Sequence, residues 1–303
     1  MKISRQTKEI INMVLFVVVA AALVIVYIVH PLGRTKAIMG RVGLDDYDED
    51  STIANDAEAW MEAELAPDTF WVESDGLTTL AVLYVQPDSA VADSARGTVC
   101  LIHGDGADRD AMIPLARRFV DSGFAVIAYD QRANGRSSGS YYGEGQYEGT
   151  DLQALVGYLE LRQRVVHPFV AVGFTLGGDA ALLATIEDKR IDRVVAIDPY
   201  LSTKRMQDIL RKRHDAYWFP FYRTIMWWWY DMRSSYAASY RDYDDIKAVA
   251  CPTLLLLSAD VSDDREVQRL VELSDPALLE MNTTLPDDED LFAEILSFMS
   301  AGE

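Results

Sequence analysis

Short apolar runs alternate with amphipathic segments along most of the chain after about residue 65. Runs rich in valine, isoleucine and leucine predict strands at 79–87, 98–104, 125–130, 169–174, 193–199 and 252–260. Apolar residues at helical spacing predict helices over 109–123, 149–163, 178–188 and 288–299. Near-continuous aliphatic strands interleaved with helices indicate an α/β fold with a mostly parallel, doubly wound sheet covered on both faces.

The most apolar stretch of the chain is residues 10–29, where Asn12 is the only polar residue and no residue is charged. A helix of this length is about 30 Å long, which matches the hydrocarbon core of a bilayer. A cleaved signal peptide is the alternative. Its apolar part is usually shorter, about 7–15 residues, and no small-residue cleavage site follows here. The sequence therefore favours an uncleaved single-pass transmembrane anchor.

The anchor divides the chain into four expected parts: an N-terminal tail at 1–9, the anchor at 10–30, an acidic linker at 31–66 and one domain at 67–303. Basic residues are balanced across the span, with Lys2, Arg5 and Lys8 before it and Arg34, Lys36 and Arg41 after it. The N-terminal amine tips this balance toward a cytoplasmic N-terminus. We therefore expect the domain on the extracytoplasmic side, periplasmic or extracellular.

The charge of the chain is strongly acidic, with 48 Asp and Glu against 28 Lys and Arg, for a net charge of −20. This surface repels phosphate backbones, so no nucleic-acid partner is expected. Nine acids and no base lie between Asp45 and Glu64, which is typical of a solvated linker or an exposed helix that holds a domain off anionic lipid. A calcium loop is disfavoured because the loop glycine and closing glutamate of an EF-hand are missing.

Two cysteines, Cys100 and Cys251, are too few for a disulfide framework or a cysteine-based zinc site. We expect no metal and no cofactor. The sequence carries no signal for a particular protein partner.

One candidate site follows the predicted strand 169–174, where the segment Gly173–Gly178 opens a helix. The pattern has the shape of a nucleophile elbow, G-x-S-x-G, with Thr175 at the serine position. Three further segments end neighbouring strands in the matching order: His103-Gly104-Asp105-Gly106, the run 130–137 (DQRANGRS) and Asp260.

Together these segments resemble the α/β-hydrolase superfamily, and most closely the membrane-anchored bacterial members of its Bem46-like, serine-aminopeptidase-like group. The resemblance covers about residues 68–303. It implies one antiparallel sheet edge, a lid after the sixth strand and hydrolysis of esters, amides or thioesters. It puts Thr175 at the nucleophile position, Asp260 at the acid position and the oxyanion-hole N–H groups at Asp105 and Leu176. The elbow glycines are then Gly173, Gly177 and Gly178.

Thr175 departs from the family pattern. Elbow nucleophiles usually adopt a positive φ, which is unfavourable for a β-branched residue. Threonine serves as a nucleophile mainly where a free N-terminal amine is its base, and Thr175 is internal.

The triad histidine is also missing from the stretch 281–290, shortly before the last helix, where the family carries it. The chain has four histidines in total. His30 flanks the anchor, His103 belongs to the oxyanion loop, His167 precedes the elbow strand, and His214 lies in the predicted lid. Without an imidazole base, a hydroxyl group is not activated at neutral pH.

The acid position is ambiguous, because Asp260 lies one place early in the family pattern and Asp263 and Asp264 are nearby alternatives. Asp260 is equally suited to be a helix N-cap. Ala133 replaces a glycine of the D-x-R-G-x-G turn.

The predicted lid insertion, about residues 200–248, holds four of the six tryptophans, three of them consecutive at 227–229. Three successive helical residues spread over about 300° and cannot share one face. Such a lid suits an apolar or acyl small molecule. A second interpretation puts part of it in the membrane interface, where Trp and Tyr are favoured and Arg211, Lys212, Arg213 and Arg223 contact anionic lipid.

The sequence as a whole favours a membrane-anchored α/β-hydrolase-fold protein with a degenerate catalytic triad, acting in binding or scaffolding at a membrane surface. The alternative is a slow or unconventional hydrolase of an acyl ester or amide that uses Thr175 and the oxyanion hole of Asp105 and Leu176.

Overall fold

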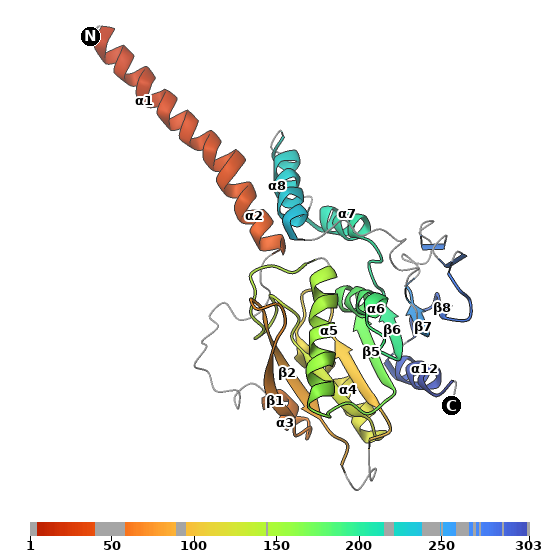
Figure 1. The fold of residues 1–303 in the computed structure, drawn as a ribbon. Coiled ribbons are helices and arrows are strands. Elements are labelled where there is room, and N and C mark those ends of the chain that lie inside the picture. The colour runs from red at the N-terminus through yellow and green to blue at the C-terminus, as the bar shows by residue number, and fades with distance from the viewer. Residues whose placement is uncertain are drawn as a thin grey trace. The chain divides into compact units, whose positions relative to one another are not determined.

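The computed structural model describes residues 5–39, 58–88, 95–143, 145–214, 221–237, 249, 251–258, 267–268, 271–272, 274–286 and 288–301. The chain divides into two compact units (Figure 1). The first, here the helical unit, comprises Met1–Gly40 and Ile209–Ala237. The second, here the sheet unit, comprises Arg41–Asp208 and Ala238–Glu303.

The sheet unit is built on eight strands in the order β1-β2-β4-β3-β5-β6-β7-β8. β1 pairs antiparallel with β2 and β2 antiparallel with β4, while all other neighbours are parallel. The strands are β1 (Asp68–Glu73), β2 (Thr79–Val85), β3 (Thr98–Ile102), β4 (Ala125–Tyr129), β5 (Phe169–Phe174), β6 (Arg193–Ile197), β7 (Thr253–Leu256) and β8 (Leu279–Asn282). The mostly parallel sheet with one antiparallel edge is confirmed.

Helices cover both faces of this sheet, as continuous aliphatic strands require. They are α3 (Glu58–Glu62), η3 (Arg109–Met112), α4 (Ile113–Asp121), α5 (Gln146–Leu161), α6 (Leu176–Glu187) and α12 (Asp288–Ser300). On one face, Leu152 and Leu155 of α5 and Leu182 of α6 belong to a buried cluster with the strands. On the other face, Phe119 of α4 and Ile295 of α12 belong to a second cluster. α5 and α6 also contact each other, and Figure 1 shows α5 in front of the strands.

The end of the acidic segment is packed rather than free. Trp60 of α3 is fully buried, and its indole Nε1 donates a hydrogen bond of 2.8 Å to Asp110 Oδ1. Leu65 is buried in the same core cluster. Glu58 and Glu62 remain exposed, so α3 is amphipathic. The earlier part of the segment, residues 40–57, lies outside the described residues.

The helical unit holds a long N-terminal helix made of α1 (Arg5–Val24), η1 (Ile25–Val29) and α2 (His30–Met39). Its stretch Arg5–Thr35 is long and apolar enough to cross a membrane, by length and composition. Helical structure thus continues beyond the apolar span into residues expected to be linker. The unit also contains α8 (Tyr222–Ala237), while α7 (Thr203–His214) crosses the division between the two units.

Candidate functional site at the turn between β5 and α6

Thr175 lies at a sharp turn between β5 and α6, with φ 45° and ψ −111°. Its N–H donates to the carbonyl of Ile197 at 2.8 Å, and its carbonyl accepts from Asp179 N at 3.1 Å. Few non-glycine residues adopt such a φ, and it costs about 1–3 kcal/mol where surrounding structure enforces it. This is the strained backbone expected for an elbow nucleophile, here carried by a β-branched residue.

The elbow glycines allow backbone segments to approach each other closely. A Cβ added to Gly173 would overlap the backbone of Gly177, and one added to Gly177 would lie 2.5 Å from the carbonyl oxygen of His103. At Gly178 the nearest atom, the carbonyl oxygen of Gly173, would lie 3.1 Å away. The close approach therefore excludes side chains at Gly173 and Gly177.

The hydroxyl of Thr175 is engaged by Asp105. Thr175 Oγ1 donates to Asp105 Oδ1 at 2.9 Å, and the backbone N–H of Asp105 donates to Thr175 Oγ1 at 3.2 Å. The hydroxyl of Tyr200 donates to the same carboxylate oxygen at 2.8 Å. The Thr175 hydroxyl thus points at the loop after β3, where a Cβ on Gly104 would meet it at 2.5 Å.

Tyr200 reaches Asp105 because a second carboxylate holds its backbone. Asp179, fully buried in the first turn of α6, accepts hydrogen bonds from Tyr200 N at 3.0 Å and from Leu201 N at 2.8 Å. Leu201 has a φ of 66°, so the turn after β6 is tightly bent. Sequence reasoning missed both Asp179 and Tyr200, although each lies within a few residues of the carboxyl end of a predicted strand.

Leu176, the second expected oxyanion donor, is the first residue of α6 and is 1% exposed. The first N–H groups of a helix have no intrahelical partner, so this position can supply a donor. With the N–H of Asp105 directed at Thr175, both predicted oxyanion positions lie beside the elbow.

His103 is fully buried and held by backbone groups. Its Nδ1 lies 2.7 Å from the carbonyl oxygen of Gly104 and therefore donates to it, while its Nε2 accepts from Gln131 N at 2.9 Å. Burial lowers the pKa of this imidazole, against the opposing effect of Asp130. His103 is thus a neutral structural residue that ties the β3 loop to the β4 loop.

The other histidines are placed away from the elbow or outside the described side chains. His167 precedes β5, at the opposite end of that strand, and contacts Asp192 at 2.5 Å and Glu160 at 3.0 Å. His30 belongs to the helical unit. The side chain of His214 is not among those the structure describes.

The two remaining positions of the triad are those of the acid and the histidine. Asp260 and its alternatives Asp263 and Asp264 lie outside the described residues. Between β8 and α12, where the family carries its histidine, Thr283 and Thr284 are exposed. The nearby Asn282 donates from Nδ2 to Glu294 Oε1 at 2.8 Å, which ties this connection to α12.

Asp198, an acid that sequence reasoning did not single out, directly follows β6. It has a φ of 48°, and its carboxylate accepts from Ser258 N at 2.6 Å. Its own N–H donates to the carbonyl of Leu256 at 2.8 Å. Asp198 therefore joins the ends of β6 and β7 at the carboxyl edge of the sheet, where ligands of such sheets bind.

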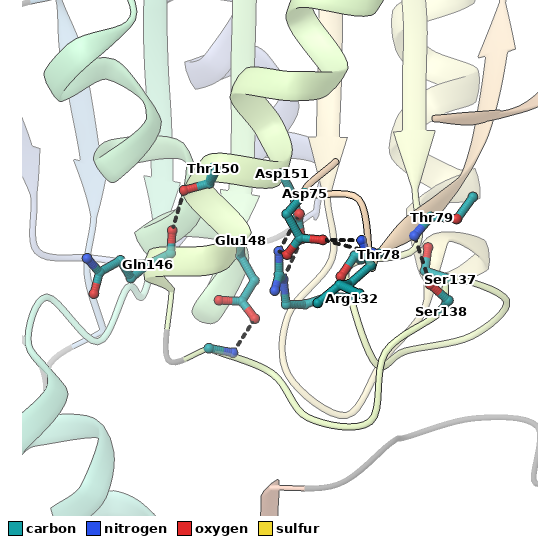
Figure 2. A network of polar contacts seen from close by, with 12 residues as sticks. Asp75, Thr78, Thr79, Arg132, Ser137, Ser138, Gln146, Glu148, Thr150 and Asp151 are labelled. Atoms are coloured by element: carbon teal, nitrogen blue, oxygen red, sulfur yellow. Dashed lines mark hydrogen bonds and ion pairs between the residues drawn. The ribbon is translucent and has the colours of Figure 1, made fainter. Parts of the chain in front are cut away.

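The loop after β4 is held by a buried polar network (Figure 2). Arg132 makes two hydrogen bonds to Asp151, of 2.7 and 2.6 Å, and one of 3.3 Å to Asp75. Glu148 accepts from the N–H groups of Gly143 and Gly145 at 2.6 and 2.8 Å. Burial raises the pKa of the Glu148 carboxyl. These contacts make the network a structural support for the loop.

Ala133 lies in the same loop with a φ of 57°, in the left-handed region that favours glycine. This explains why the family pattern has a glycine there. The nearby Asp130 accepts from Arg109 N at 2.9 Å and Arg136 N at 3.0 Å, which fixes the turn despite the alanine.

The strand order and the sharp turn between β5 and α6 define an α/β-hydrolase fold. A family model described as serine aminopeptidase, S33, matches residues 93–283, and the chain therefore belongs to this family. No curated protein matches the chain.

Solved structures with the same fold include several hydrolases. Esterase Pf2001 from Pyrococcus furiosus is 20% identical, with a TM-score of 0.64 over 79% of this chain and 94% of that one. The α/β hydrolase GrgF from Penicillium sp. sh18 is 16% identical, with a TM-score of 0.56 over 78% and 98%. The esterase EaEST from Exiguobacterium antarcticum is 14% identical, with a TM-score of 0.56 over 77% and 100%. At these identities the likeness shows the shared fold.

Proposed function

We propose that this protein is a single-pass, membrane-anchored member of its family that has lost hydrolytic catalysis and acts by binding at a membrane surface. The N-terminal helix is the anchor, and the sheet unit faces the extracytoplasmic side. The ligand is an apolar or acyl small molecule, as the aromatic composition of the insertion suggests. The acidic charge disfavours nucleic acid.

The observation that carries this proposal is the contact between the Thr175 hydroxyl and the Asp105 carboxylate. A working elbow nucleophile passes its proton to an imidazole, whereas a carboxylate is intrinsically a much weaker base than an imidazole. The same carboxylate lies on the residue whose N–H would stabilise the oxyanion. A negative group at that point disfavours the negative charge that develops there during acyl transfer.

The histidines support the same conclusion. His103 uses both ring nitrogens in contacts with backbone groups, so it has no lone pair available for Thr175. The stretch 281–290 contains no histidine in sequence. A threonine in a strained conformation, without a base, then serves as a steric and polar wall of a binding site rather than as a nucleophile.

One observation favours the alternative, a slow hydrolase of an acyl ester or amide. Thr175 keeps the positive φ of a nucleophile, and the N–H of Asp105 is directed at its oxygen. A preserved oxyanion hole can supply residual catalysis even when triad members are missing. In that mechanism Asp105 accepts the hydroxyl proton as Thr175 attacks the acyl carbon, and the proton passes to the alcohol or amine that leaves as the ester or amide bond breaks. Water then hydrolyses the acyl-threonine ester and releases the acid.

The test compares the full chain in detergent with Thr175→Val, which keeps the shape of the side chain and removes its hydroxyl. With a short-chain aryl ester as substrate, we expect both proteins to match the buffer background. A fluorescent long-chain fatty acid should bind both with similar affinity. Turnover by the wild type well above background that Thr175→Val abolishes would overturn the proposal in favour of the alternative.

The membrane part is tested separately by protease protection of the sheet unit in sealed vesicles. In vesicles whose interior corresponds to the extracytoplasmic side, we expect the sheet unit to be protected until detergent is added. Digestion without detergent in those vesicles would contradict the assigned orientation.

A further inference from the structure

Helix α8 of the insertion has two apolar faces. Its buried face is formed by Tyr222, Met226 and Tyr230, spaced four residues apart, together with Trp227. The opposite face is exposed: Phe221 is 77% exposed and Trp228 is 54% exposed. At 100° per residue, Trp228 and the half-buried Ile225 lie on the side of the helix away from the buried residues. Phe221 directly precedes the helix with a φ of 60°, and these three residues are called the exposed stripe below.

The buried face packs on the end of the N-terminal helix. The Tyr222 hydroxyl lies 2.5 Å from His30 Nδ1, and the two rings are 5.5 Å apart. Thr35 is fully buried, and its hydroxyl contacts the carbonyl oxygen of Met226 at 3.2 Å and that of Pro31 at 2.9 Å. α8 also contacts η1, the last part of the apolar span. Helix α8 is therefore docked on the anchor itself.

The contacts of Tyr222 and Met226 with α2 determine the direction of α8 and its position along the N-terminal helix. Tyr222 lies beside His30 and Met226 beside Thr35, so α8 and α2 run in the same direction. The first residue of α8 is thus level with the residue that follows the apolar stretch ending at Val29. Phe221 lies at this boundary, and Trp228 lies about 10 Å further along the helix. Helical side chains lean toward the N-terminus, so the indole of Trp228 leans back toward the boundary.

The composition of the exposed stripe fits the lipid headgroup layer. Phe and Trp favour the boundary between hydrocarbon and water, where a tryptophan ring sits at the headgroup level, and Ile adds apolar surface on the same side. Arg223 is exposed in the first turn of α8, which contains no acidic residue. Although the whole chain has a net charge of −20, this first turn is basic and can contact the phosphates of lipid headgroups.

We propose that the first half of α8 lies in the headgroup layer of the bilayer, with Phe221, Ile225 and Trp228 facing lipid and Tyr222, Met226 and Tyr230 docked on the anchor. This inference rests on the proposed membrane anchoring. It makes the insertion a membrane-attached element. The stripe and the anchor belong to one compact helical unit, in which α8 contacts both η1 and α2.

The experiment places an environment-sensitive fluorophore on single cysteines in the full chain, reconstituted in phosphatidylcholine–phosphatidylglycerol vesicles. The background is Cys251→Ser, since Cys100 is buried and inaccessible to label. Trp228→Cys and Phe221→Cys probe the stripe. Leu23→Cys probes the apolar span, and Leu77→Cys, at an 89% exposed position of the sheet unit, is the aqueous control. Quenching is measured with nitroxide lipids labelled at shallow or deep positions and with aqueous iodide.

We expect labels at 221 and 228 to emit at shorter wavelength than the label at 77. They should be quenched several-fold more strongly by shallow than by deep nitroxides, whereas position 23 prefers the deep ones. If position 23 is quenched by lipid but 221 and 228 behave like 77, the inference on α8 is wrong and the anchor stands. Shielding of 221 and 228 from iodide without lipid quenching also overturns it, in favour of a second copy or an acyl ligand. If position 23 itself escapes lipid quenching, the anchoring fails and this inference fails with it.

Discussion

The hydroxyl of Thr175 and the carboxylate of Asp105 form a closed pair, in which Thr175 donates to the Asp105 side chain at 2.9 Å and accepts from the Asp105 backbone at 3.2 Å. A substrate carbonyl would need the backbone N–H of Asp105 as a hydrogen-bond donor. That N–H already donates to the hydroxyl of Thr175, which is the group that would attack the carbonyl. Any ligand at this turn must displace Thr175 from Asp105 or bind beside the pair.

Thr175→Ser alone should leave the protein unlabelled by a fluorophosphonate probe. Serine removes the β-methyl group and makes the positive φ less unfavourable, but the missing imidazole is unchanged, so the hydroxyl stays unactivated. Labelling of the full chain in detergent is read on a gel. An active serine hydrolase treated alongside confirms the probe, and robust labelling of the variant would show that another group serves as base.

Gly104→Ala should destabilise the sheet unit through a clash with one side chain. The new methyl group would lie 2.5 Å from Thr175 Oγ1, and the next nearest atom, the carbonyl oxygen of Phe174, would be 3.4 Å away. Overpacking of this kind costs about 1–3 kcal/mol. In a Thr175→Ala background the cost should fall, giving a coupling energy of about 1–2 kcal/mol in chemical denaturation.

Gly106→Ala is the matched control for this cycle. Gly106 has a φ of 74° and no atom within 4 Å of its added Cβ, so alanine there is strained by the backbone alone. That cost, about 1–2 kcal/mol, should be the same with threonine or alanine at 175. Equal effects of Gly104→Ala in both backgrounds would mean that the Thr175 hydroxyl does not lie against Gly104.

Asp179→Ala should lower the free energy of unfolding by about 3 kcal/mol or more, because it leaves the N–H groups of Tyr200 and Leu201 without an acceptor in a buried site. Asp179→Asn keeps one oxygen and should lose roughly half as much. Chemical denaturation of both variants measures the difference. A loss below about 1 kcal/mol for Asp179→Ala would contradict the role of this carboxylate in holding the turn after β6.

His167 should make stability dependent on pH. Its hydrogen bond to Asp192, opposed by partial burial and helped by Glu160, raises the pKa of the imidazole above its usual 6.5. The folded state then binds the proton more tightly than the unfolded state. This contribution is fully present below pH 6.5 and is lost as the pH rises through the higher folded value.

The measurement compares the free energy of unfolding of the wild type and His167→Gln at mildly acid and alkaline pH. From mildly acid to alkaline pH, we expect the free energy of unfolding of the wild type to fall further than that of the variant. The difference should be less than about 1 kcal/mol, because the His167–Asp192 pair is about half exposed to solvent. A variant with the same pH dependence as the wild type would show that His167 makes no such contribution.

The strands that could be predicted from sequence are those whose side chains are buried on both faces, because an unbroken aliphatic run leaves no other placement. β1 (Asp68–Glu73) was missed because it is an edge strand with acidic ends and little aliphatic content. β8 (Leu279–Asn282) was missed because four residues at the other edge carry too little pattern. Edge strands have only one neighbour, so their sequences are less constrained.

The site was predictable only as far as local chain geometry determines it. The glycines of the elbow predict a turn in which backbone segments approach closely, and the structure has that turn at Thr175. For Asp105, the sequence pattern points only to the backbone N–H. Its side-chain contact depends on Tyr200, which comes from a different strand end and is placed by Asp179. Contacts assembled from three separate segments leave no pattern in any one of them.

The docking of α8 on α2 changes what a protease cut would do. A cut in the segment between α2 and α3 breaks the chain once, yet α8 remains covalently joined to the sheet unit and packed through Tyr222 and Met226 on the N-terminal fragment. Release of the sheet unit from the N-terminal helix would therefore need two events, the cut itself and the separation of two packed helices.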